Sequence, residues 1–210
     1  MSARALLACG AIAPVLFVVT FLIDGATRPG YDPWRNFVSQ LSTGERGWVQ
    51  ITNFIVCGLL FIAGAVGLWR VRGPRAATVI IGVLGVCLIL AGIFVTDAGL
   101  GYPPGERVLP RPTLHDTIHQ LVSLPAFLAL GLAPIVAALQ LRASRAWTVY
   151  SVLSGVVSLT FFAAMVVLAA EEERIGSNAA LGLIQRISII ASFTWLAAFF
   201  ARLWRSTAGK

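Results

Sequence analysis

Residues 76–96 read AATVIIGVLGVCLILAGIFVT, and this stretch decides the class of fold. It holds no charged side chain, and it is bounded by Arg75 on one side and Asp97 on the other. A hydrocarbon layer about 30 Å thick needs roughly 20 apolar residues of helix to cross it. A helix satisfies its own backbone hydrogen bonds in lipid, whereas an open strand does not. The stretch therefore predicts a transmembrane helix.

Five further apolar runs of the same kind occur along the chain. They cover about residues 5–23, 49–69, 114–141, 147–170 and 179–204. Of the 210 residues, 58% are apolar and 12% are charged, against roughly 25% charged in a typical soluble domain. A soluble fold needs more polar residues than this to cover its surface. We therefore predict an all-α fold in which residues 1–210 form a single transmembrane domain, a polytopic bundle of six helices.

The charged residues divide between the two ends of this predicted bundle. With the N-terminus in the cytoplasm, the inner end carries nine basic residues and no acid, and the outer end carries all nine acids. Basic residues in short loops mark the cytoplasmic side, so we predict a multi-pass protein of the plasma membrane with both termini cytoplasmic. The basic residues form short clusters between apolar runs, so the net charge of +7 does not indicate nucleic-acid binding.

The first outer loop contains an amphipathic segment. Asp32 can cap a helix that Pro33 opens, and four apolar residues follow at the spacing of one helical face. These residues are Trp34, Phe37, Val38 and Leu41. We predict a short amphipathic helix over Asp32–Ser42 on the outer surface, with Arg35 and Gln40 facing water.

The two histidines of the chain, His115 and His119, lie four residues apart at the start of the fourth predicted span. Thr113 and Asp116 have the spacing of a capping box, so a helix begins there and both imidazoles share one face. Such a pair can hold a divalent metal ion, transfer protons near neutral pH, or bond only to water and neighbouring groups. Because no complete zinc motif surrounds them, we predict no cofactor, with a metal held by both histidines as the alternative.

Ionisable residues within or at the ends of apolar spans are further candidates for function, because burying them is unfavourable unless they are paired. Asp24 ends the first span, Asp97 ends the third, and Arg186 lies roughly two turns into the sixth. Arg186 can pair with an acid or hold an anionic group. We expect Asp97 and both histidines to share one hydrogen-bond network at the outer mouth, with Arg186 near an acid.

Two short motifs lie in the first outer loop and at the end of the third span. They are Gly30-Tyr31-Asp32 with Ser39-x-Leu41-Ser42, and Gly92-Ile93-Phe94-x-x-Asp97 with a following helix that begins near His115. In these motifs, and over nearly the whole chain, the sequence resembles a large prokaryotic membrane family catalogued as domain of unknown function 998. That family often has proline after the phenylalanine, where this chain has Val95, which leaves the approach to Asp97 unkinked. The resemblance implies a six-helix bundle with its marked polar residues on the outer side, and it implies no reaction. The positions it marks are Tyr31, Asp32, Ser39, Ser42, Asp97 and His115; His119 is added from its spacing alone.

The predicted function rests on the expected convergence of these groups at one end of an apolar bundle. An apolar cavity with a few polar groups is what a small-molecule site requires. We predict an enzyme that acts on a lipid or isoprenoid-like substrate at the outer leaflet, either by hydrolysis with a histidine as base or by acid-initiated rearrangement with an aspartic acid as proton donor. The alternative is a non-enzymatic protein that binds membrane lipid or an apolar small molecule, a sensor or a small transporter. The catalytic candidates are Asp97, His115, His119 and Asp24, and the substrate-binding candidates are Tyr31, Asp32, Ser39, Ser42, Arg186, Phe94 and Trp195.

Overall fold

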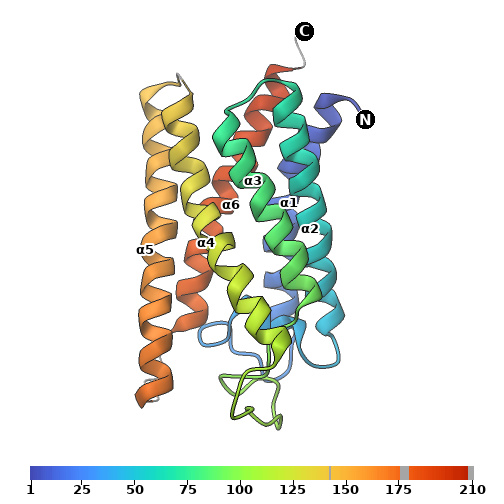
Figure 1. The fold of residues 1–210 in the computed structure, drawn as a ribbon, viewed down its shortest axis with the longest axis vertical. Coiled ribbons are helices and arrows are strands. Elements are labelled where there is room, and N and C mark those ends of the chain that lie inside the picture. The colour runs from blue at the N-terminus through green and yellow to red at the C-terminus, as the bar shows by residue number, and fades with distance from the viewer. Residues whose placement is uncertain (142, 176–179, 208–210) are drawn as a thin grey trace.

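The protein forms an up-and-down bundle of antiparallel helices with both termini at the same end (Figure 1). The structure, a computed structural model, describes residues 1–141, 143–175 and 180–207, with the backbone alone for residues 172–175. Six of the helices in this part of the chain are long and apolar enough to cross a membrane. They are α1 (Ala3–Ala26), α2 (Gly47–Arg70), α3 (Arg75–Ile93), α4 (Leu114–Gln140), α5 (Arg145–Ile175) and α6 (Leu181–Ser206). The predicted all-α membrane bundle is therefore confirmed.

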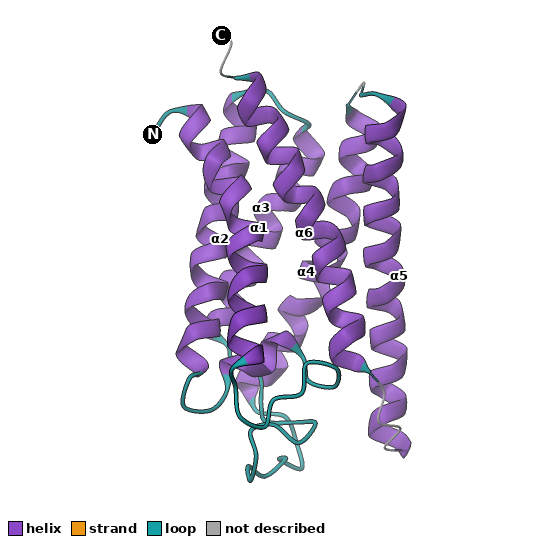
Figure 2. Cartoon of the chain, turned by 180° about the vertical axis from the view of Figure 1, so that it is seen from behind, coloured by secondary structure: helices purple, strands orange, loops and turns teal. Residues whose placement is uncertain are grey.

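Each helix packs on the next in the chain, and α6 returns to pack on α1. The helix α5 lies at one edge, against α4 and α6 (Figure 2). Only 22% of its apolar span is buried, against 39% or more in the other five. The core of the bundle is therefore built by the other five helices, while α5 presents most of its surface outward.

The helices α2 and α3 approach closely at two facing glycines. A Cβ atom added to Gly58 would lie 2.6 Å from the carbonyl oxygen of Gly85, and one added to Gly85 would lie 2.7 Å from that of Gly58. Small residues of this kind let helix backbones meet in a membrane, where van der Waals packing drives association. The two glycines therefore fix the distance between these helices.

The third helix ends earlier than the sequence predicts. It stops at Ile93, so Asp97 lies beyond the helix rather than at its last turn. The residues after it are held by α4: the Asp116 carboxylate accepts hydrogen bonds from the Thr96 hydroxyl (2.8 Å) and the Asp97 N–H (3.1 Å). Because these bonds come from another helix, the apolar run 76–96 alone does not reveal the end.

The first loop does not contain the predicted amphipathic helix over Asp32–Ser42. Residues 33–36 form a turn, and a 3-10 helix, η1, covers only Val38–Ser42. The side chain of Gln40, predicted to face water, is 3% exposed. Its Oε1 accepts the Phe37 N–H and its Nε2 donates to the Gly99 carbonyl, so it satisfies backbone groups that a helix would otherwise pair. Of the apolar residues expected on one helical face, Leu41 is fully buried and Trp34 is 62% exposed.

Candidate functional site

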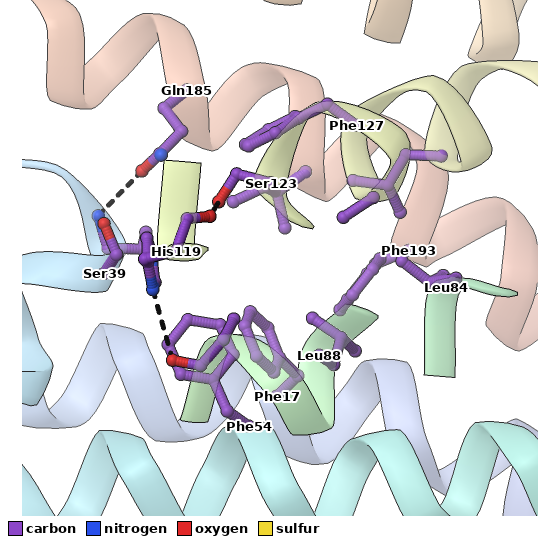
Figure 3. A pocket seen from close by; sticks show the side chains of 15 residues that line it. Phe17, Ser39, Phe54, Leu84, Leu88, His119, Ser123, Phe127, Gln185 and Phe193 are labelled. Carbon is purple, nitrogen blue, oxygen red and sulfur yellow. Dashed lines mark hydrogen bonds between the residues drawn. The ribbon is translucent and has the colours of Figure 1, made fainter. Parts of the chain in front are cut away.

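A cavity of about 60 Å³ lies between α1, α2, α3, α4 and α6, under η1 (Figure 3). Its walls are apolar in the middle of the bundle and polar at the end that carries the long loops. The polar side chains that line it are Ser39, His119, Ser123 and Gln185, and the principal apolar ones are Phe17, Phe54, Leu84, Leu88, Phe127 and Phe193. The cavity therefore has the polarity of an amphipathic molecule, with one polar end and one apolar body.

His119 is the ionisable side chain of this cavity, and it is 3% exposed. Its Nδ1 lies 2.8 Å from the carbonyl oxygen of Phe94 and 3.2 Å from that of Ala91. Carbonyl oxygens only accept, so Nδ1 carries the proton and Nε2 of the neutral ring holds the lone pair. The Phe54 ring packs edge-on against the imidazole, with 6.2 Å between the two ring centres. The ring is thus held in one tautomer with Nε2 available as a base.

The hydroxyl groups near His119 differ in what they already bind. Ser123 Oγ donates to the His119 carbonyl at 2.7 Å, one turn back along α4. Among the described residues, the Ser39 hydroxyl and His119 Nε2 have no hydrogen-bond partner, and they are not bonded to each other. Both line the cavity, so both can bind a polar group placed there.

Gln185 joins the sixth helix to the loop that covers the cavity. Its Oε1 accepts the Val38 N–H at 2.7 Å, and Val38 and Ser39 both line the cavity. Gly182 and Leu183, at the start of α6, donate their N–H groups to the carbonyls of Arg35 and Trp34. The N-terminal turn of α6 therefore holds the loop over the cavity, and these unpaired backbone donors find acceptors there.

Asp97 is bound to the start of α4 and does not line the cavity. Its two carboxylate oxygens accept the N–H and the hydroxyl of Thr113, each at 2.8 Å. Thr113 in turn caps α4 by accepting the Asp116 N–H at 3.1 Å, as its spacing predicts. The expected network of Asp97 with both histidines does not form, because the carboxylate is used to join α3 to α4.

His115 is exposed at the first turn of α4, and its ring packs edge-on against Phe94 at 5.4 Å. His119 lies one turn further in and points into the bundle. Within the part of the chain that the structure describes, no cluster of three or more His, Cys, Asp or Glu residues gathers around them or elsewhere. The shared helical face therefore does not bring the two imidazoles into one environment.

Asp24 is buried and pairs with two arginines, the buried Arg28 and the exposed Arg46. It is 2% exposed, and its carboxylate accepts Arg28 at 2.9 Å and Arg46 at 2.8 Å. Arg28 also donates to the carbonyls of Leu41, Thr43 and Arg46 and to the Tyr102 hydroxyl. Burial lowers the pKa of Arg28, but the bonds to Asp24 and Tyr102 outweigh it and leave that pKa above its usual value. Asp24 is thus a paired anion that anchors the first loop, outside the cavity.

Arg186 is buried at the start of α6, and none of its hydrogen-bond partners in the described chain is the acid that the sequence predicts. It donates to the carbonyls of Pro33 (2.7 Å), Asn36 (2.9 Å) and Gly182 (2.8 Å), and to the Tyr31 hydroxyl. Burial raises the pKa of Tyr31 to about 12 although Arg186 opposes the rise, so the phenol stays protonated and donates to the Phe37 carbonyl. Arg186 therefore fastens the first loop to α6.

The remaining predicted residues lie in different places. Asp32 is exposed and accepts the Trp34 N–H, and Ser42 is buried and donates to the Ser39 carbonyl. Trp195 is buried ten residues beyond Gln185, where its Nε1 donates to Ser151 at 2.8 Å. Of all the predicted site residues, only His119 and Ser39 line the cavity.

Three side chains that hold the first loop in place were not predicted from the sequence: Gln185, Arg28 and Tyr102. Gln185 is a polar residue inside an apolar span, which is a usable sign of an inward-facing position. Arg28 follows Asp24 by four residues, the spacing at which opposite charges pair on a helix. Nothing in the sequence near Tyr102 indicates its contact with Arg28, 74 positions away.

Comparison with known proteins gives one match. The model of the family described as "Protein of unknown function (DUF998)" matches residues 11–202. No curated protein and no solved structure matches the chain. The match covers all six transmembrane helices almost entirely, together with the loops that build the cavity. The chain therefore belongs to the DUF998 family of membrane proteins of unknown function.

Proposed function

We propose that this protein is a membrane-embedded enzyme that hydrolyses an amphipathic, lipid-like molecule with a narrow apolar chain. The chain of the substrate occupies the apolar part of the cavity, and its scissile ester lies at the polar end. The observation that carries the proposal is the fixed tautomer of His119, whose Nδ1–H is held by backbone carbonyls while Nε2 is available.

Hydrolysis fits this arrangement better than acid-initiated rearrangement. His119 Nε2 takes a proton from water or from the Ser39 hydroxyl, and the resulting oxygen nucleophile attacks the ester carbonyl. The ester C–O bond breaks as the imidazolium returns the proton to the leaving alcohol. Where Ser39 is the nucleophile, water attacks the acyl-serine in a second step, with His119 again as the base, and releases the acid. A carboxylic acid is needed for the rearrangement, and the acids proposed for it, Asp24 and Asp97, are bound elsewhere.

Replacing His119 with asparagine is the sharpest test, because the amide nitrogen takes the place of Nδ1 and keeps the bond to Phe94. The variant loses the far edge of the ring, Cε1 and Nε2, and with it the base. We expect hydrolysis of p-nitrophenyl octanoate by the purified protein to fall at least about 100-fold, the usual contribution of a general base. His115→Asn, on the same helix but exposed, is the matched control and keeps its activity.

A second candidate function, binding without chemistry, is favoured by the lining of the cavity, because none of its described side chains is an acid that could pair with His119. In either function the cavity must widen around its ligand, since its volume of about 60 Å³ is below the roughly 300–1,000 Å³ of ordinary small-molecule sites. Mass spectrometry of lipids that copurify with the protein separates the two functions. The binding role would be favoured if the native protein and both histidine variants all retain a lipid while the native protein shows no hydrolysis. Equal hydrolysis in the two variants would favour it as well.

We further propose that the cavity end faces outward, so that both termini are cytoplasmic in the plasma membrane and the substrate enters from the outer leaflet. The support is the charge asymmetry: no acid occurs at the end with the termini, where short basic loops mark the cytoplasmic side.

Cysteine labelling in intact cells tests this orientation. In a background without the three native cysteines, a membrane-impermeant maleimide is expected to label Glu106→Cys and to leave Ala143→Cys unmodified until the cells are permeabilised. Labelling of Ala143→Cys in intact cells would reverse the orientation.

A further inference from the structure

The end of the bundle opposite the cavity carries a basic hollow at the turn between α2 and α3. It has a volume of about 190 Å³ and is lined by Trp69, Arg70, Arg72, Gly73 and Arg75. The three arginines fall within six consecutive residues, and all three are exposed. The turn lies at the same end as both termini (Figure 1).

Within the part of the chain that the structure describes, no acid forms an ion pair with the arginines of this hollow. The sequence has no Asp or Glu between Glu45 and Asp97, and the first turn of α3 has no acidic side chain. Arg70 donates to the backbone carbonyl of Met1 at 2.8 Å, which leaves its charge uncompensated. Three guanidinium groups beside the positive end of the α3 dipole therefore make a strong site for an anion.

In this turn an arginine, Arg72, occupies a left-handed backbone position at which glycine is usual. Arg72 has a φ of 54°, in the left-handed region, and the Gly73 N–H closes the end of α2 by donating to the Leu68 carbonyl at 2.8 Å. Helix ends of this type normally place glycine at the left-handed position because it has no Cβ atom. A strained arginine at the mouth of a basic hollow points to a role for its side chain.

The hollow lies at the level of the membrane interface. Trp69, 59% exposed, is at its edge, and the Arg75 guanidinium lies 5.7 Å from the centre of the Trp69 ring. Two more arginines at this end lie over tryptophan rings, Arg4 over Trp204 at 4.4 Å and Arg202 over Trp147 at 5.0 Å. Tryptophan gathers at the headgroup level of membranes. The phosphate layer therefore surrounds the hollow.

We propose that this hollow binds the phosphate of an anionic phospholipid headgroup. Basic pockets at the ends of membrane helices recognise such headgroups. The acyl chains have apolar surface beside it, because the exposed Val66 lies four residues before Arg70 on α2, and the exposed Val79 and Val83 lie four and eight residues after Arg75 on α3, each on the same helical face as its arginine. This apolar surface favours a lipid over free phosphate. The site is at the opposite end from His119 and is independent of the hydrolytic proposal.

Native mass spectrometry of the full chain in detergent, titrated with phosphatidylglycerol or with phosphatidylcholine of the same acyl chains, tests the site. We expect Arg70→Gln/Arg72→Gln/Arg75→Gln to weaken phosphatidylglycerol binding at least about tenfold, since it removes the guanidinium groups that bond directly to the phosphate. The control Arg4→Gln/Arg145→Gln/Arg205→Gln removes the same charge from the same end but leaves the hollow intact, and it keeps the affinity within about twofold of the native protein. Equal losses in both triple variants would mean diffuse charge attraction and would overturn the site.

Arg72→Gly separates binding from structure. Glycine suits the left-handed backbone, so the variant is expected to keep or raise the melting temperature while it weakens phosphatidylglycerol binding about fivefold. Unchanged binding in Arg72→Gly, or displacement of the lipid by millimolar inorganic phosphate, would overturn the proposal.

Discussion

Replacing Arg186 with methionine is expected to lower the free energy of unfolding by about 4 kcal/mol. The guanidinium is 6% exposed and binds the carbonyls of Pro33, Asn36 and Gly182 together with the Tyr31 hydroxyl. Methionine fills a similar length but donates nothing, so these buried acceptors lose a charged donor. Denaturant titration in mixed micelles, followed by tryptophan fluorescence, measures the change.

The matched control is Arg205→Met, which removes an exposed arginine from the other end of the same helix. It is expected to change the unfolding free energy by less than about 0.5 kcal/mol. A loss below about 1 kcal/mol in Arg186→Met would mean that the first loop is held mainly by the Arg28 cluster. In that case the loop over the cavity would keep its protection from proteolysis.

The second large effect is expected at Asp24. Asp24→Asn leaves Arg28 buried without its anion, and breaking a buried pair in this way costs roughly 3–5 kcal/mol. The same unfolding titration measures the loss, with the exposed Glu45→Gln as a control that stays within about 0.5 kcal/mol. The double variant Asp24→Asn/Arg28→Met is expected to recover part of the loss, because it removes the unpaired charge as well.

This experiment also decides between the two roles considered for Asp24. If Asp24 is a proton donor, Asp24→Asn abolishes activity without a large change in stability. If Asp24 anchors the first loop, the same variant is strongly destabilised. Full stability combined with loss of ester hydrolysis would therefore contradict the structural role and restore the catalytic one.

The six membrane crossings could be predicted because each is a local property of about 20 consecutive residues. The end of α3 could not, since it depends on Asp116 and His119 of another helix. The segment over Asp32–Ser42 has helical periodicity, yet its amide side chains bond to backbone groups and hold a turn and a 3-10 helix instead. Periodicity indicates which residues would share a helical face. It does not show where a side chain will form a hydrogen bond with a backbone group and so replace the helical backbone hydrogen bond.

The candidate site was predictable only in part, for a related reason. His115 and His119 differ in direction by about 40° on a helix of 3.6 residues per turn, which predicts a common face. However, His115 lies one turn closer to the helix start, where its imidazole is exposed. The loop and the neighbouring helices enclose only His119, one turn further into the bundle. The depth at which a bundle closes is set by its loops, and the contacts that fold them, such as Arg28 with Tyr102, join distant positions.

The position of α5 has a consequence for the direction of the chain. None of its described side chains lines the cavity, and most of its surface faces outward. It nevertheless carries the chain back across the membrane, so that α6 starts at the end where Gln185 and Arg186 are needed. A chain that lost α5 would run α6 the opposite way and deliver both residues to the wrong leaflet. The helix α5 thus keeps the number of membrane crossings even, and this places the start of the last helix on the same side of the membrane as the first loop. A shorter relative with an odd number of crossings would have to build this site in another way.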